Sequence, residues 1–120
     1  MTDEMNLKFK EVGERLKSLA NNLESTSKKM DNMSMAVLVG DITDVEACKN
    51  INEKWEEIES EKNEITSIID QISDCLKDKE SEDQVDLVKV EELLNSYEEL
   101  FNKQEEDIKL INEMLDKVTK

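Results

Sequence analysis

The sequence predicts an all-α protein built from three long heptad-patterned helices, arranged as an antiparallel three-helix bundle or a coiled-coil hairpin. Two observations support this prediction. Apolar residues recur at alternating spacings of four and three along three segments, which is the pattern of helices that pack side by side. The 120 residues also include no proline and only two glycines, so few positions break a helix. We expect a single helical domain over residues 1–120.

The first helix is expected at about residues 3–38. Gly40 follows it, and glycine readily adopts the left-handed conformation that ends a helix. The inward-facing row of residues, which we call the seam, is Met5, Phe9, Val12, Leu16, Leu19, Leu23, Thr26, Met30, Met33 and Val37.

The second helix is expected at about residues 44–77. Thr43 and Glu46 form a capping box, in which each side chain would bond the backbone amide of the other residue. The seam of this helix is Cys48, Ile51, Trp55, Ile58, Lys62, Ile65, Ile69, Ile72 and Leu76.

The third helix is expected at about residues 82–118, with a weaker capping box formed by Ser81 and Gln84. Short connections between the helices favour antiparallel neighbours. The seam is Leu87, Val90, Leu94, Tyr97, Phe101, Gln104, Ile108, Ile111, Leu115 and Val118.

Three polar residues, Thr26, Lys62 and Gln104, interrupt the seams. If the hairpins close tightly, the equal rise of packed helices places Gln104 near Ile58. Lys62 would lay its aliphatic stem on apolar surface while its ammonium group reaches solvent. Lys62 and Gln104 either fix the register inside one bundle or mark where the seam opens to receive a partner helix.

The net charge of −15 argues against binding to nucleic acid or anionic lipid, because both require a basic patch. The charge is uneven along the chain. Residues 1–40 carry six basic and six acidic side chains, whereas residues 41–80 sum to −8 and residues 81–120 to −7. The first helix could therefore lie against the two acidic helices, or it could meet an acidic partner helix.

The N-terminal residues do not resemble a secretory signal, and the longest apolar run, Met35–Val39, is far shorter than the roughly 20 residues of a membrane span. We therefore expect a cytoplasmic protein without direct membrane insertion. Cys48 and Cys75 lie too far apart on one predicted helix to form a disulfide within the molecule, so we expect them to be buried thiols.

The sequence contains no histidine, so it lacks the usual acid-base residue at neutral pH and any imidazole metal ligand. A cysteine nucleophile would have no histidine partner. We therefore expect no enzymatic activity, no cofactor, no metal and no small-molecule substrate. Divalent-ion binding by the acidic helices is a distant alternative.

A second apolar row on the third helix and an apolar cluster at the end of the first helix suggest a partner interface. A second apolar row on the third helix contains Leu93, Leu100 and Met114, and the end of the first helix is rich in apolar side chains that include Met30, Met33 and Val37. These six residues are our candidate interface, and we expect the partners to be other helical protein chains. Changing Leu93 and Leu100 to Glu should abolish partner capture while leaving helicity nearly intact.

The stretch from Leu16 to Ser34 resembles the small subunits of two eukaryotic coiled-coil assemblies, the biogenesis of lysosome-related organelles complex and the DASH kinetochore complex. The resemblance covers about a sixth of the chain. It implies a non-catalytic helical subunit in endosomal or lysosomal cargo sorting, associated with endosomes through its complex, or alternatively a kinetochore or spindle assembly subunit. The rival hypothesis is a self-contained monomeric three-helix bundle that acts as a binding or chaperone-like module.

Overall fold

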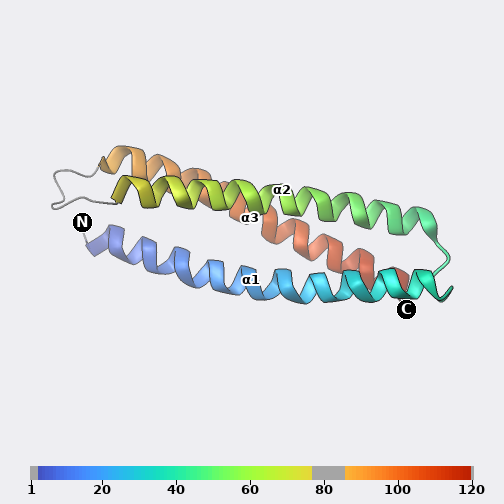
Figure 1. Ribbon diagram of the computed structural model, residues 1–120. Helices are drawn as coiled ribbons and strands as arrows, with labels where there is room; N and C mark the ends of the chain where they lie inside the picture. Colours follow the sequence, from blue (N-terminus) through green and yellow to red (C-terminus); the bar gives the residue numbers. More distant parts are fainter. Residues whose placement is uncertain (1–2, 77–85, 120) are drawn as a thin grey trace. The chain divides into compact units, whose positions relative to one another are not determined.

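The computed structural model describes residues 3–76 and 86–119, which form three α-helices and no strand. The helices are α1 (Asp3–Leu38), α2 (Val45–Leu76) and α3 (Leu87–Thr119), as Figure 1 shows. The prediction of an all-α protein with three long helices is confirmed. Within the described part of the chain, no helix is both long and apolar enough to cross a membrane.

The chain divides into two compact units. Unit 1 comprises Met1–Trp55 and Asp107–Lys120, and unit 2 comprises Glu56–Glu106. Helices α2 and α3 therefore contribute to both units, whereas α1 belongs to unit 1. The sequence of unit 2 holds 18 acidic and 5 basic residues, which is −13 of the total −15 and leaves −2 for unit 1. Nearly all of the excess negative charge thus lies in one unit.

Unit 1 is a three-helix bundle in which two polar contacts show how α1 and α3 are aligned. Asn112 Nδ2 donates a hydrogen bond to Thr26 Oγ1 at 3.1 Å, and Lys29 lies 3.9 Å from Asp116. Because the two contacts advance in the same direction along both helices, α1 and α3 run parallel here. The buried residues of unit 1 are Leu19, Thr26, Met30, Met33, Ile42, Cys48, Ile51, Asp107, Ile108, Ile111 and Leu115.

Unit 2 pairs the rest of α2 with the part of α3 that ends at Glu106. Gln104 Nε2 donates a hydrogen bond to the Ile58 carbonyl at 3.0 Å, so the predicted proximity of these two seam residues is confirmed. The rings of Tyr97 and Phe101 lie 5.5 Å apart between centroids. The buried residues of unit 2 are Ile58, Glu61, Ile65, Ile72, Val90, Leu94, Tyr97, Phe101 and Gln104.

The start of α2 differs from the predicted one. The helix begins at Val45, and Asp44 rather than Thr43 caps it: Asp44 Oδ1 accepts the Ala47 amide hydrogen bond at 3.1 Å. Aspartate is a better N-cap than threonine, and its charge also complements the positive end of the helix dipole. The predicted capping box between Thr43 and Glu46 is therefore wrong by one residue.

The start of α3 also differs from expectation. We expected a helix from about residue 82, but Asp86 lies outside the helix and its Oδ1 accepts the Lys89 amide hydrogen bond at 3.1 Å. Asp86 is thus the N-cap of a helix that begins at Leu87. The predicted capping residues Ser81 and Gln84 lie outside the described residues.

The polar position in the seam of α2 is Glu61, not Lys62. Lys62 is exposed, whereas Glu61 is only 4% exposed and lies 3.4 Å from the ammonium group of Lys103. The buried residues of this segment are therefore spaced three and then four apart, from Ile58 through Glu61 to Ile65. A buried carboxylate needs such a cationic neighbour, which the sequence pattern of a single helix does not reveal.

Both cysteines are free thiols, but the prediction that both are buried holds only for Cys48. Cys48 is buried in unit 1, and Cys75 is half-buried in unit 2.

Candidate interaction surface

The end of α1 is a tight reversal that depends on Gly40. This residue has a φ of 83°, its amide donates to the Val37 carbonyl at 3.2 Å, and the Asp41 amide donates to the Ala36 carbonyl at 2.8 Å. These two bonds form a Schellman motif, which satisfies the last carbonyls of a helix. Because the chain turns away at once, the side chains of the last helical turn are left at the surface.

Exposed apolar side chains are concentrated at this reversal. Eight large apolar side chains are exposed in the described part of the chain, and five of them lie within residues 35–45. We call these five the turn patch: Met35 (60% exposed), Val37 (40%), Leu38 (80%), Val39 (66%) and Val45 (74%). A cluster of exposed apolar side chains is typical of an interaction site, whereas single ones are ordinary.

A pocket of about 430 Å³ lies next to the turn patch along the chain, within unit 1. Its volume falls in the range of sites that accept ligands in proteins. The apolar lining consists of Ile42, Ala47, Ile51, Met114 and Val118. The polar lining consists of Asp41, Thr43, Asp44, Asn50 and Lys117. Residues 41–44 thus border the pocket and also join it to the turn patch.

The structure separates the six predicted interface residues. Val37 belongs to the turn patch, and Met114 lines the pocket. Leu93 and Leu100 are half-buried on the part of α3 that belongs to unit 2, and their role in partner binding stays a prediction.

The burial of Met30 and Met33 does not agree with their prediction as interface residues. They are 8% and 1% exposed, so they belong to the core of unit 1 rather than to a surface open to partners. Their spacing from Thr26 continues the seam, and the flexible methionine side chain fills irregular space in a core.

Sequence reasoning missed the contributions of Ile42, Val45 and Val118. The turn patch does have a signal in the sequence, namely the apolar run Met35–Val39. Five consecutive apolar residues exceed what one helix face can bury, so some of them must be exposed. The pocket has no local signal, since its walls come from segments more than 60 residues apart in sequence.

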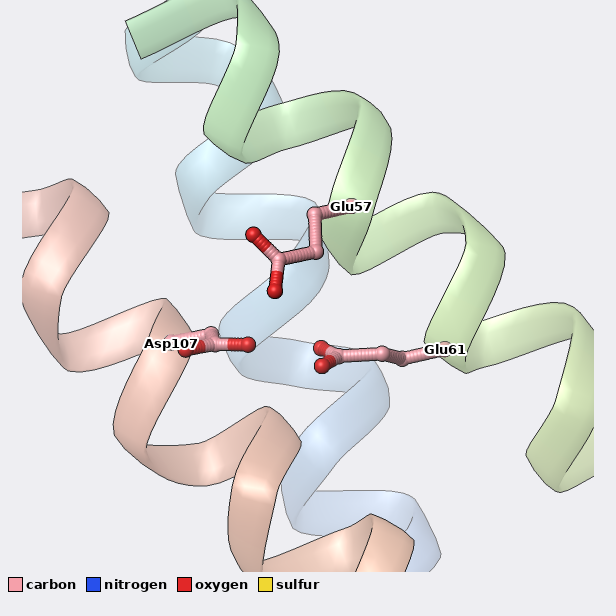
Figure 2. Close-up of side chains that lie close together, drawn as sticks. All are labelled: Glu57, Glu61 and Asp107. Carbon is pink, nitrogen blue, oxygen red and sulfur yellow. The ribbon is translucent and has the colours of Figure 1, made fainter. Parts of the chain in front are cut away.

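The buried carboxylates are explained by ion pairing. Figure 2 shows Glu57 and Glu61 leaving the same side of α2, and Asp107 on α3. Within unit 2, Lys103 lies 3.7 Å from Glu57 and 3.4 Å from Glu61. Within unit 1, Lys54 lies 3.2 Å from Asp107, and both side chains are largely buried. Buried charges are tolerated when they are paired in this way, so we assign Glu61 and Asp107 to packing, whereas Glu57 is exposed.

Comparison of the chain with protein-family models, with curated proteins and with solved structures finds no match.

Proposed function

We propose that this protein is a non-catalytic helical subunit of a coiled-coil multiprotein complex, and that it docks through the turn patch and the adjacent pocket. One observation supports this most directly. Of the eight large apolar side chains exposed in the described part of the chain, five lie in an eleven-residue segment that borders a partly apolar pocket of about 430 Å³.

The energetics favour covering this surface. Burying apolar area is worth roughly 25 cal/mol per Å², or about 1.5–3 kcal/mol for a whole aliphatic side chain. Leu38, Val39 and Val45 are 66–80% exposed, so each would gain most of that free energy in an interface. A few such side chains near the centre of an interface usually dominate its affinity.

The chemistry of the side chains supports a non-catalytic role. The chain has no histidine. The buried carboxylates of Glu61 and Asp107 have lysine partners, so they are occupied in packing. A docking function needs only the exposed apolar surface and the scaffold that holds it.

For the cellular setting we favour endosomal or lysosomal cargo sorting, with kinetochore or spindle assembly as the alternative. The support is the resemblance of Leu16–Ser34 to small subunits of such assemblies. A self-contained bundle that acts as a binding or chaperone-like module is the rival function. The packing of all three helices in unit 1 favours that rival, because such a bundle can bury a core without a partner.

The test is a comparison of two double variants of the full chain. Leu38→Glu/Val39→Glu places charges on the turn patch. The matched control, Leu7→Glu/Val88→Glu, changes residues that are 57% and 68% exposed outside the patch. Tagged wild type and both variants are expressed in the source cells, and stoichiometric co-purifying proteins are quantified by mass spectrometry.

We expect the patch variant to lose helical partner chains that wild type and control retain, while circular dichroism shows equal helicity. Retention of the same partners by the patch variant would refute docking through this surface. A concentration-independent monomer with a cooperative melt and no stoichiometric partner would favour the self-contained module instead.

A further inference from the structure

Resting on the proposed docking function, we propose that the pocket and turn patch bind a basic amphipathic helix from another protein. The walls of the pocket indicate the shape of this ligand, and the charges around it indicate the sign of its flanking residues.

The pocket has the walls of a helix-binding groove. Helix α2 contributes Ala47, Asn50 and Ile51, at positions i, i+3 and i+4. Helix α3 contributes Met114, Lys117 and Val118 with the same spacing. Residues at these spacings form ridges on a helix, and the groove between two such ridges accepts the side chains of a further helix. An amphipathic helix inserts apolar residues spaced i, i+3, i+4 and i+7 into grooves of this kind.

The apolar lining of the pocket suits large aliphatic or aromatic side chains of the ligand, which we call its anchors. Ile42, Ile51 and Val118 give the pocket a mainly branched aliphatic lining, and Met114 can adjust to the shape of an anchor. The exposed side chains of Leu38 and Val39 would extend the apolar contact beyond the pocket. A helix longer than the pocket could therefore bury both surfaces.

Three acidic residues lie on the chain segment that leads into the pocket. Asp41, Asp44 and Glu46 are exposed, and none of the three forms an ion pair with any described residue. Asp44 also caps α2, and Lys117 is the one basic residue in the pocket lining. Lysine or arginine flanking the anchors of the ligand would face these carboxylates favourably.

The same charges disfavour a second copy of this chain as the ligand. A copy carries a net charge of −15, of which −13 lies in unit 2, so the unit 2 surface of a copy would repel the three carboxylates. An acidic helix would be rejected for the same reason.

The first experiment uses two fluorescein-labelled peptides of about 18 residues, or five helical turns. Both have leucine at heptad positions a and d. One carries lysine and alanine elsewhere, and the other carries glutamate and alanine. We expect the lysine peptide to bind the full chain at least about tenfold more tightly in fluorescence anisotropy at physiological salt. Equal binding of the two peptides would overturn the inference, because it would indicate purely apolar recognition.

Methionine methyl NMR locates the bound peptide. The lysine peptide should shift the ε-methyl signals of Met35 and Met114 and leave that of Met5, at the far end of α1, unchanged. Shifts of Met5 without shifts of Met35 and Met114 would place the peptide elsewhere and overturn the inference.

A charge-matched pair of variants separates local recognition from general acidity. Asp41→Lys/Glu46→Lys and Glu98→Lys/Glu99→Lys change the net charge equally, and all four residues are exposed. The first variant should weaken binding of the lysine peptide about tenfold, and the second less than about twofold. Equal effects would mean that the peptide responds only to net charge, which would overturn the inference.

A second pair tests the pocket itself. Ala47→Phe fills the pocket, whereas Ala20→Phe places the same side chain on the exposed side of α1. Only Ala47→Phe should weaken peptide binding, while both variants keep wild-type helicity. Unchanged peptide affinity of Ala47→Phe would overturn the inference. Self-association of the wild type that Ala47→Phe abolishes would also overturn it, because the ligand would then be a second copy.

Failure of this inference can be distinguished from failure of the proposed function. If Leu38→Glu/Val39→Glu loses native partners but the lysine peptide does not bind, docking stands and the basic helix is wrong. If native partners are retained by that variant, the docking function itself is wrong, whatever the peptides do.

Discussion

Gln104→Leu should stabilise the protein, although it removes a buried hydrogen bond. Gln104 is fully buried, and its Nε2 donates to the Ile58 carbonyl at 3.0 Å. Its Oε1 is also buried and has no hydrogen-bond partner. Leucine has nearly the same size, removes this unsatisfied acceptor, and matches the apolar seam above and below.

The magnitude follows from two opposing terms. Losing the hydrogen bond costs about 1 kcal/mol, whereas removing a buried unsatisfied acceptor gains roughly 1–3 kcal/mol. The Ile58 carbonyl keeps its bond within α2, so no new unsatisfied group is created. We expect a net gain of about 1 kcal/mol, which corresponds to about 4 °C in the melting temperature of a domain of this size.

Urea denaturation followed by circular dichroism measures this change, with the slope of the transition compared between proteins. Two further variants serve as controls. Gln71→Leu makes the same change at an exposed position and should alter the stability by less than about 0.5 kcal/mol. Gln104→Glu keeps the shape but adds a buried charge, and it should destabilise the protein.

A loss of stability in Gln104→Leu would refute this reasoning. It would mean that Oε1 is hydrogen-bonded in solution, or that the polar side chain is required for the native helix register. An unchanged midpoint would show that the two terms cancel and that the cost assigned to the unsatisfied acceptor is too large.

Three further predictions, at Gly40, Asp44 and Lys103, are tested by the same urea assay. Gly40→Ala should lower the free energy of unfolding by about 1 kcal/mol, because φ is 83° and no atom lies within 4 Å of the added methyl group. Gly40→Asn should lower it less, and equal losses in the two variants would argue against backbone strain. Asp44→Ala should cost about 1 kcal/mol through loss of the bond to the Ala47 amide, and no loss would show that the cap is dispensable. Lys103→Met should destabilise the protein, because it leaves the buried Glu61 carboxylate without this cationic neighbour. Adding Glu61→Met should restore much of the stability, and a double variant as unstable as the single one would contradict the ion-pair assignment.

The apolar spacing predicted the helices and most of the core well. On α3, every predicted seam residue is buried except Leu87 and Val118, which are half-buried. A one-dimensional pattern gives this information because the period of an α-helix determines which side chains share a face. The starts of α2 and α3 were less predictable, because a threonine or serine earlier in the sequence is also a suitable N-cap. The structure places Asp44 and Asp86 at these positions.

The candidate site was predicted only in part. Val37 and Met114 are at the turn patch and the pocket, but Met30 and Met33 are core. The sequence showed a surplus of apolar residues near the end of α1. Which of them became buried depended on the packing of α2 and α3 against that face, and heptad spacing alone does not specify it.

The sequence by itself determined three helices, the apolar face of each, and a reversal at Gly40, because these depend on helical periodicity and on local backbone preference. Only the tertiary structure decided that Glu61 is buried and Lys62 exposed, since the position of Lys103 on another helix makes the buried carboxylate tolerable. Tertiary structure likewise created the pocket, which has one wall from the start of α2 and another from the end of α3. Burial and cavities are properties of several segments together, so no single segment encodes them.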